Sequence, residues 1–521
     1  MIDSSLPYPS QRAPLAAANV VATSQPLAVQ SGLDALRRGG NAVDAALAAA
    51  ITLSIVEPCS NGIGSDAFAI LWDGSELVGI NGSGRAPALW TRERFSGHTR
   101  MPQYGWDSVT VPGAVSVWVA LSARYGRLPF ERLFDDAIRY AESGFQVGPR
   151  TALHWAEAAD LYAEYRDFAD HFLPAPAFAA RVSLPDAART LREIAESGGE
   201  SFYRGALAER MEAAAVAQGG ALRTSDLAAH RADWVTPLAQ PYRDVTLHEI
   251  PPNGQGLAAQ IALGILGHAE PPRRDSAEAL HRQIEAMKIA LRAAADHIAD
   301  PAAMQVGVEA LLDPASLARA ATSIGERAAS LPPRALPTSP DTVYLCAADA
   351  DGMMVSFIQS NYYGFGSGIV VPGTGIALQN RGFGFSLEPG HPNEVGPRKR
   401  PFHTIIPGFV TEQDAPRLAF GVMGGPMQAQ GHVQMMTRLF DYGQNPQAAS
   451  DAPRWQVLSD YSVLLEPGVP DLVAADLAER GHDVRIAKNH LDFGGAQLVL
   501  RTADGYVAGS DHRKEGHAGG F

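Results

Sequence analysis

The fold is decided around residues 331–360, which read LPPRALPTSPDTVYLCAADADGMMVSFIQS. Residues 331–340 carry several prolines and no hydrophobic period, which predicts an exposed loop. Thr342 to Ala348 then has the pattern of a strand, Asp349 to Gly352 that of a turn, and Met353 to Ser360 that of the returning strand. This segment therefore predicts a proline-rich loop that leads directly into a β-hairpin.

The chain before this loop is mostly helical in pattern, with a few strands near its start. Val20–Ser24, Ala67–Trp72 and Leu77–Asn81 are predicted strands. Helices are predicted at Pro26–Arg38, ended by Gly39 and Gly40, and at Ala42–Ile55, capped by Asn41. Residues 129–330 are predicted to be mainly helical. Since helices and strands do not alternate as βαβ units, the pattern favours a layered α+β fold over a doubly wound sheet.

Composition narrows the class of protein. The chain has 521 residues and a net charge of −14, which argues against a nucleic-acid partner because phosphate binding needs basic surface. The two cysteines, Cys59 and Cys346, cannot form a disulfide framework and are predicted to be packed core thiols. No basic stretch followed by a continuous apolar run marks a signal peptide. Residues 45–56 are too short to cross a bilayer, so we expect a cytoplasmic protein without a membrane partner.

Thr342 is the first candidate for chemistry. A threonine hydroxyl is a weak nucleophile at neutral pH and needs an adjacent base. If the bond between Asp341 and Thr342 were cut, the new α-amine of Thr342, with a pKa near ~8, would become that base. The alternative is that Thr342 has only a structural role as the first residue of a strand, and the residue by itself does not exclude this.

A second candidate lies at residues 418–426, LAFGVMGGP. A predicted strand ends in Gly424 and Gly425, and Pro426 then opens a helix that runs to about Phe440. Adjacent glycines at a helix N-terminus let backbone N–H groups approach a ligand, which suits an oxyanion hole. A tight turn between strand and helix explains the same pattern equally well.

Short motifs in chain order resemble those of one known family. They are GGNAVDAA (39–46), VEP (56–58), GIG (62–64), VPG (111–113), TVYL (342–345), DG (351–352), FGSG (365–368), GPRKRP (396–401), GG (424–425), APR (452–454) and GSD (509–511). Each motif is weak alone, but their order along nearly the whole chain is specific. The chain thus resembles the gamma-glutamyltransferases, a family of N-terminal-nucleophile hydrolases.

The resemblance implies a four-layered αββα sandwich with a largely helical insertion in the first half. It also implies self-cleavage before Thr342 into a large subunit, residues 1–341, and a small subunit, residues 342–521, which share one core. Thr342 would be the nucleophile, Ser360 its hydrogen-bonding partner, and Gly424 and Gly425 the oxyanion hole. No cofactor or metal is expected, and a homodimer or heterotetramer is compatible with the resemblance.

The substrate pocket departs from the usual family pattern. Typical members bind the α-amino group of a glutamyl substrate with an acid, yet residues 379–385, QNRGFGF, have Gly384 there and no carboxylate. A buried ammonium without a counter-charge would be costly. The tandem serines of the family are replaced by His403 and Thr404. We therefore predict this set of substrate-binding residues: Arg85, Arg381, Thr404, His403, Asn361 and Tyr362. Packing without substrate contact is the alternative for His403, and a surface position is the alternative for either arginine.

A pocket that contains cationic side chains but no acidic one suits a substrate amide that carries a carboxylate but no α-amino group. Residues 359–368 and 378–382 also resemble the amidohydrolase branch that includes oxamate amidohydrolase, so we expect an oxamate-like substrate. Two alternatives remain: a γ-glutamyl hydrolase or transpeptidase that acts on glutathione, and an unprocessed homologue without catalysis.

A metal-dependent mechanism is the alternative to catalysis by a threonine nucleophile. His281, Glu285, His297 and Asp300 lie in one predicted helical region, but no two histidines flank a glutamate at i and i+4. We expect them to lie on a solvated helix face.

Overall fold

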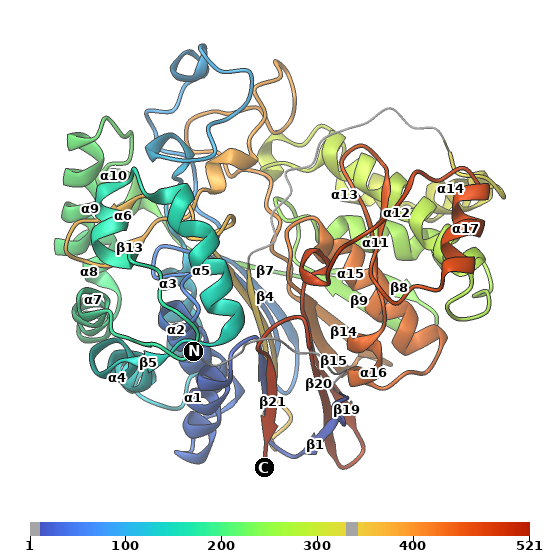
Figure 1. Ribbon diagram of the computed structural model, residues 1–521, viewed down its shortest axis with the longest axis horizontal. Coiled ribbons are helices and arrows are strands. Elements are labelled where there is room, and N and C mark those ends of the chain that lie inside the picture. The colour runs from blue at the N-terminus through green and yellow to red at the C-terminus, as the bar shows by residue number, and fades with distance from the viewer. Residues whose placement is uncertain (1–10, 330–341) are drawn as a thin grey trace.

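The protein is built from two large sheets enclosed by two helical layers. A computed structural model describes residues 11–329 and 342–521. The two seven-stranded sheets face each other in the middle, and helices cover the outer face of each (Figure 1). This arrangement is the four-layered αββα sandwich expected from the resemblance.

The first sheet contains the hairpin predicted at residues 342–360. All its neighbouring strands are antiparallel. Its order is β21 (His517–Gly520), β2 (Val20–Thr23), β10 (Val343–Ala348), β11 (Met354–Ser360), β3 (Asp66–Trp72), β4 (Leu77–Asn81) and β7 (Asp233–Val235). The hairpin strands β10 and β11 therefore lie at the centre, paired on both sides with strands from the front of the chain.

The second sheet is also antiparallel throughout. Its order is β1 (Leu15–Ala17), β20 (Gly505–Ser510), β19 (Ala496–Thr502), β15 (Ala415–Val422), β14 (Gly408–Glu412), β9 (Val245–Glu249) and β8 (Leu238–Tyr242). Both sheets thus combine strands from either side of the 330–341 segment.

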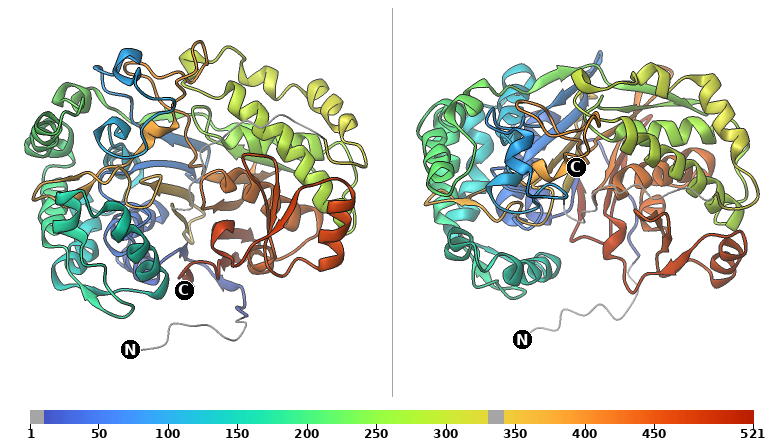
Figure 2. Two further views of the ribbon diagram at one scale, coloured as in Figure 1. Left: turned by 45° about the horizontal axis from the view of Figure 1, so that its top comes forward. Right: turned by 90° about the horizontal axis from the view of Figure 1, so that it is seen from above.

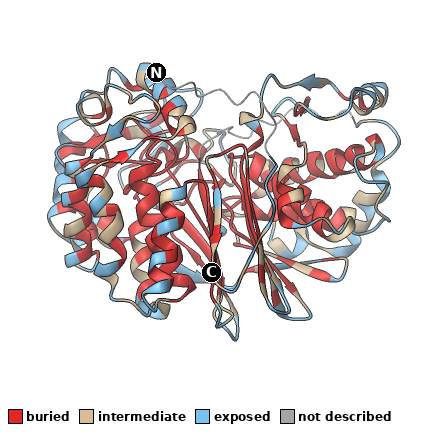
Figure 3. Ribbon diagram, turned by 60° about the horizontal axis from the view of Figure 1, so that its bottom comes forward, coloured by how far each residue is buried: buried red, intermediate tan, exposed pale blue. Residues whose placement is uncertain are grey.

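The two sheets bury one continuous apolar layer between them. Every second residue of β10 and β11 points into it, including Tyr344, Cys346 and Ile358, which meet Phe409 and Val499 of the opposite sheet. This alternation is what period-two strands require when one face lies against another sheet. The opposite faces of the strands pack against helices, so all β10 and β11 residues are buried (Figure 3).

Helix α2 (Ala42–Val56) covers the first sheet, and all fifteen of its residues are buried. The side chain of Asn41 accepts hydrogen bonds from the backbone N–H groups of Val43 and Asp44 at 3.0 Å, and Asp44 accepts from the N–H of Asn41. Such a reciprocal cap stabilises a helix by about 1 kcal/mol. The predicted cap and helix are confirmed. Helix α1 (Pro26–Arg37) packs beside α2 and ends before Gly39, whose φ of +90° suits glycine.

The remaining helices divide between the two outer layers, as the tilted view and the view from above show (Figure 2). On the side of the first sheet lie α3 (Ala114–Tyr125), α4 (Asp135–Ser143), α5 (Pro149–Tyr162), α6 (Arg166–Phe172), α7 (Pro185–Glu196), α8 (Glu200–Arg204), α9 (Ala206–Ala217) and α10 (Thr224–Ala229). On the side of the second sheet lie α11 (Gly256–Leu266), α12 (Ala277–His297), α13 (Val308–Leu311), α14 (Pro314–Ser323), α15 (Met427–Met436), α16 (Pro446–Asp451) and α17 (Asp471–Glu479).

Three small sheets complete the described fold. They are β5 (Phe145–Gln146) with β6 (Arg181–Val182), β12 (Val370–Val371) with β13 (Ile376–Ala377), and β16 (Trp455–Val457) with β17 (Val463–Leu465) and β18 (Val484–Ile486).

Residues 129–330 are mainly helical, as predicted, although 233–249 form β7, β8 and β9. These strands are stabilised by pairing with β4 and β14, which local sequence patterns do not report.

One expectation needs correction, namely that His281, Glu285, His297 and Asp300 lie on a solvated helix face. His281 and Glu285 are 1% and 4% exposed, and Asp300 is buried as well, whereas His297 is half-buried. His281 and Glu285 face the interior because α12 is covered there by the segment around His482, and Asp300, which follows α12, accepts from the backbone N–H of Arg400.

Three further points concern individual predictions. The two cysteines are free and buried, as predicted. The predicted loop at 331–340 and Asp341 lie outside the described residues. Within the described residues, no helix is both long and apolar enough to cross a bilayer.

Candidate active site

Three side chains stand in a row across neighbouring strands of the first sheet. Asp66 on β3 is the register partner of Ser360 on β11, and Thr342 precedes β10, the next strand. The residues two positions further along these strands face the layer between the sheets. Because side chains alternate along a strand, Thr342, Ser360 and Asp66 share this inner face at one end of the sheet. All three are at most 1% exposed.

Among the described residues, the side chains of Ser360 and Gln428 lie within hydrogen-bonding distance of the Thr342 hydroxyl. Thr342 Oγ1 donates to Ser360 Oγ at 3.2 Å, and Ser360 Oγ accepts from the backbone N–H of Tyr362 at 2.8 Å. Gln428 Nε2, from the first turn of α15, lies 3.5 Å from Thr342 Oγ1. Its Oε1 accepts from the backbone N–H of Ile406 at 3.0 Å, which turns the amide nitrogen toward the threonine. Gln428 was not predicted as a site residue; its position three residues after Gly425 was the only available signal.

Gly424 and Gly425 form the turn between β15 and α15. Their φ angles are +114° and +55°, and a Cβ on Gly424 would lie 3.2 Å from Cα of Gly494, so glycine is required there. Both residues are buried, yet neither backbone N–H donates a hydrogen bond to another described residue. Two buried, unsatisfied N–H groups are costly unless a ligand accepts from them. The pair therefore has the hydrogen-bonding capacity expected of an oxyanion hole.

Arg381 brings a positive charge into the same region. It is fully buried, donates from Nη1 to Thr404 Oγ1 at 2.8 Å, and lies 4.1 Å above the ring of Tyr362. Its Nε and Nη2 atoms have no hydrogen-bond partner within the described residues. Burial lowers the pKa of Arg381 to about 10, which leaves the side chain charged at neutral pH. Two free donors of a buried guanidinium form a site for an anion.

Asp66 and His403 form a buried pair beside this cation. Asp66 Oδ1 accepts from the N–H of Gly113 at 2.9 Å, and His403 Nε2 lies 3.1 Å from Asp66 Oδ2. His403 Nδ1 accepts from the N–H of Ile405 at 3.3 Å, so Nε2 carries the proton and donates. Burial raises the pKa of Asp66 to about 7 and lowers the pKa of His403. Both ring nitrogens of His403 are therefore engaged within the protein.

Two other predicted pocket residues have different surroundings. Arg85 has a side chain 45% exposed, and its Nη1 lies 3.2 Å from Asp300 Oδ2, so its described contacts do not join it to Arg381. Asn361 is buried, and its Oδ1 accepts from Ser65 Oγ at 2.8 Å, whereas its Nδ2 has no partner among described residues.

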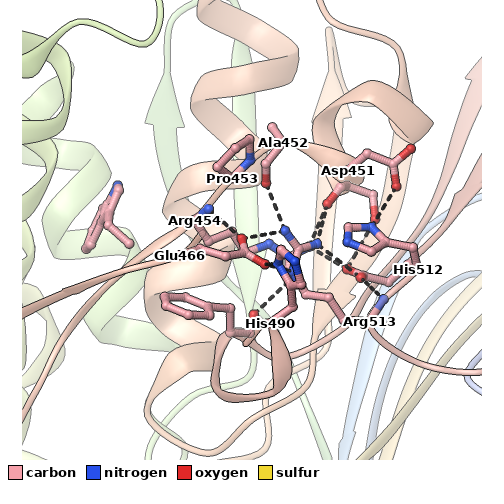
Figure 4. A network of polar contacts seen from close by, with 12 residues as sticks. Asp451, Ala452, Pro453, Arg454, Glu466, His490, His512 and Arg513 are labelled. Carbon is pink, nitrogen blue, oxygen red and sulfur yellow. Dashed lines mark hydrogen bonds and ion pairs between the residues drawn. The ribbon is translucent and has the colours of Figure 1, made fainter. Parts of the chain in front are cut away.

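An ion network supports the loop beside Gly424. Arg513 donates to both carboxylate oxygens of Glu466 at 2.6 Å (Figure 4). Arg454 Nη2 pairs with Asp511 at 2.5 Å. Burial alone would raise the pKa of Asp511. The charges of the neighbouring arginines outweigh burial, so the pKa of Asp511 lies below its usual value. Arg454 Nη1 also donates to the carbonyl of Phe493 at 2.7 Å. The network thus holds the residue that precedes Gly494, the glycine packed against Gly424.

Two groups of described residues have metal-ligand chemistry. In the group of His281, Glu285 and His482, the Lys288 ammonium already lies 2.8 Å from Glu285 Oε1 and 3.2 Å from His482 Nδ1. In the other group, Glu466, His490 and His512, both Glu466 oxygens accept from Arg513. In each group, a lysine or arginine side chain already pairs with the carboxylate that a metal ion would need as a ligand.

The αββα layers place the protein in the class of N-terminal-nucleophile hydrolases. The chain belongs to the gamma-glutamyltranspeptidase family, whose sequence profile, described as Gamma-glutamyltranspeptidase, matches residues 28–521.

Proteins similar to this chain include two proenzymes and one solved structure. It is 37% identical to the oxamate amidohydrolase proenzyme of Klebsiella pneumoniae, with 95% of this chain and 97% of that protein covered. It is 35% identical to the glutathione hydrolase-like YwrD proenzyme of Bacillus subtilis, with the same coverage. A cephalosporin acylase crystal structure from Bacillus halodurans is 47% identical, with a TM-score of 0.96 over 100% of this chain and 99% of that one.

Proposed function

We propose that this protein is a self-processing amidohydrolase that cleaves the amide of a small, carboxylate-bearing acyl group, such as oxamate, through a threonyl ester on Thr342. The relatives that are named proenzymes support processing, and the buried Arg381 supports the choice of acyl group. Subunits of residues 1–341 and 342–521 would stay associated, because β10 and β11 are flanked by β2 and β3 from the front of the chain.

Processing would begin with attack of Thr342 Oγ1 on the carbonyl carbon of Asp341. The peptide nitrogen of Thr342 leaves as an amine when the bond breaks, and an ester joins Asp341 to the Thr342 oxygen. Water then hydrolyses the ester, which frees the Asp341 carboxylate and restores the hydroxyl. The products are a new C-terminus and a threonine with a free α-amine.

Catalysis would use the same oxygen. The α-amine accepts the proton of Thr342 Oγ1 as the oxygen attacks the substrate carbonyl, and the N–H groups of Gly424 and Gly425 bind the oxyanion. The proton passes to the leaving nitrogen, the C–N bond breaks, and an acyl-enzyme ester remains. Water activated by the amine then releases the acid. The contacts of Thr342 Oγ1 with Ser360 and Gln428 would hold this oxygen in place during attack.

The positive charge of Arg381 indicates which acyl group the site would bind. Nε and Nη2 of Arg381 can donate two parallel hydrogen bonds to a carboxylate. Among the described residues near Arg381, residue 384 is glycine and the Asp66 carboxyl is already engaged by Gly113 and His403, so neither supplies a free acid for an α-ammonium. The buried guanidinium with two free donors is the observation on which the proposal rests.

Two measurements test the proposal. Intact mass spectrometry should find cleavage before Thr342 in the wild type and a single uncut chain in Thr342→Ala, which should also be inactive. The wild type should release ammonia from oxamate, succinamate or glutaramate faster than it cleaves a γ-glutamyl anilide. An active protein with an intact 341–342 bond refutes the mechanism, and turnover of only the anilide replaces the acyl group with the γ-glutamyl alternative.

A further inference from the structure

The segment between β9 and α11 reaches the active site from the front of the chain. Residues 251–256 read PPNGQG and separate the strand from the helix. Gly254 forms a parallel β-bridge with His403. The next residue along, Thr404, accepts the hydrogen bond from Arg381. The segment therefore runs beside the pocket that would bind the acyl carboxylate, although none of the groups assigned to catalysis above belongs to it.

Gln255 connects this segment to the turn that carries the oxyanion donors. It precedes the first residue of α11, which packs against α15 (Figure 1), and it is fully buried. Its backbone N–H donates to the carbonyl of His403 at 2.9 Å. Its side-chain Nε2 donates to the carbonyl oxygens of Thr404 at 2.6 Å and of Gly425 at 2.8 Å. Both side-chain partners are acceptors, so the amino group of the amide has to face them.

The bond to Gly425 acts on a turn that has little stiffness of its own. Gly424 and Gly425 adopt φ angles of +114° and +55°, and glycine has the widest choice of backbone conformations. The carbonyl of Gly425 also accepts from the N–H of Gln428 at 3.1 Å, so both of its lone pairs are used. Contacts from outside the turn are needed to hold its two N–H groups in one direction, and Gln255 supplies such a contact.

We propose that Gln255 is a positioning residue whose side-chain amide ties Gly425 to Thr404, and so holds the oxyanion donors at a fixed place relative to the pocket for the acyl carboxylate. The proposal rests on the proposed function, in which Gly424 and Gly425 bind the oxyanion. Donors that are already in place stabilise the transition state because they need no reorganisation during the reaction. Loss of the Gln255 amide should therefore lower kcat and leave KM nearly unchanged.

Gln260 of the same helix offers a matched control. It is as fully buried as Gln255, and its Nε2 also donates to two carbonyls, those of Leu238 at 2.7 Å and Leu247 at 3.3 Å. In both glutamines, Oε1 has no hydrogen-bond partner among the described residues. The carbonyls bound by Gln260 belong to β8 and β9, which contain none of the described site residues. A purely structural loss should therefore be alike at the two positions.

The first comparison is between Gln255→Met and Gln260→Met. Each variant removes two hydrogen bonds to buried carbonyls, so the two melting temperatures should fall by similar amounts. Only Gln255→Met should lower kcat, by about tenfold, which is less than the hundredfold or more expected when an oxyanion donor is lost outright. Its KM should change by less than about twofold. Equal kcat values in the two variants, or a loss confined to KM, would overturn the proposal.

The second comparison changes the donor but keeps the shape of the side chain. The ionised carboxyl of Gln255→Glu has no hydrogen to donate to the two carbonyls, whereas its protonated form has one. Its kcat relative to that of the wild type should therefore rise as the pH falls from about 9 to about 6, and the ratio for Gln260→Glu should stay constant. The wild type contains the nearby Glu249, His403 and Arg381 as well, so the ratio removes their own titration. A ratio that is independent of pH, or that changes alike in both variants, contradicts the proposal, even where Gln255→Met does not fold.

The readouts also separate Gln255 from the choice of acyl group. Each kcat is measured with oxamate or γ-glutamyl p-nitroanilide, whichever the wild type hydrolyses faster. Turnover of only the anilide would refute the acyl group and leave the comparison intact. Acetylation by p-nitrophenyl acetate, in which the Thr342 hydroxyl attacks the ester carbonyl and p-nitrophenolate leaves, needs the oxyanion hole but no acyl pocket. Mass spectrometry of the small subunit should find slower acetylation in Gln255→Met than in Gln260→Met, and equal rates would refute the role of Gln255 alone.

Discussion

Replacement of Arg381 by methionine should lower activity while leaving the fold at least as stable. Arg381 Nε and Nη2 are free within the described residues, and each hydrogen bond from a charged donor contributes roughly 1.5–3 kcal/mol. Loss of two such bonds to the substrate carboxylate costs at least about 3 kcal/mol, or about 150-fold in kcat/KM. Because the contact exists before and during reaction, most of the loss should be a higher KM.

Stability should change in the other direction. Burial lowers the pKa of Arg381, and within the described residues no carboxylate forms a direct ion pair with it, so the folded protein bears part of the cost of burying this charge. A methionine of similar length removes that cost and gives up mainly the hydrogen bond to Thr404 and the contact with Tyr362. We therefore expect a melting temperature equal to or above that of the wild type.

The assay compares kcat/KM for a carboxylate-bearing amide with kcat/KM for a neutral amide of the same length. The preference for the carboxylate should disappear in Arg381→Met and be retained in part in Arg381→Lys, which keeps the charge but loses the planar fork. An equal loss for both amides, or a fall in melting temperature of the same size as that of a core truncation, would contradict this reasoning.

Three further predictions concern the surroundings of Thr342. Gln428→Ala should slow both processing and turnover by about tenfold, which corresponds to the loss of one neutral hydrogen bond. A time course on denaturing gels would measure processing, and kcat would measure turnover. Unchanged rates would exclude a role of Gln428 at Thr342 Oγ1. Gly424→Ala should lower kcat by about a hundredfold or more, because it disturbs the oxyanion hole. It should also lower the melting temperature, because φ of Gly424 is +114° and Gly494 occupies the space that a Cβ would need. A normal kcat would rule out the oxyanion hole. Burial raises the pKa of Asp66 and of Glu57 to about 7, so each favours folding below about pH 4 and loses this contribution as the pH rises to 7. Asp66→Asn should therefore flatten the fall in unfolding free energy between pH 4 and 7, as urea titrations would show; an unchanged slope would mean that Asp66 titrates normally.

Local patterns were sufficient for elements stabilised by contacts near in sequence. The hairpin of β10 and β11, the cap at Asn41 and the strand that precedes Gly424 all follow from turn residues, capping residues and period-two alternation. The strands β8 and β9 could not be found in this way, because they pair with each other and then with β14, more than 150 residues later. The buried positions of His281 and Glu285 depend in the same way on His482.

The sequence by itself determined the class of fold, the family and the candidate nucleophile, since these follow from short motifs whose order is preserved along the chain. Only the tertiary structure decided which side chains meet Thr342. Asp66, Ser360 and Gln428 come from three segments, and their arrangement depends on strand register and on the packing of α15 against a sheet. The two donors of Arg381 that have no partner among the described residues are likewise visible only in three dimensions, because an unsatisfied group is defined by the absence of nearby partners in space.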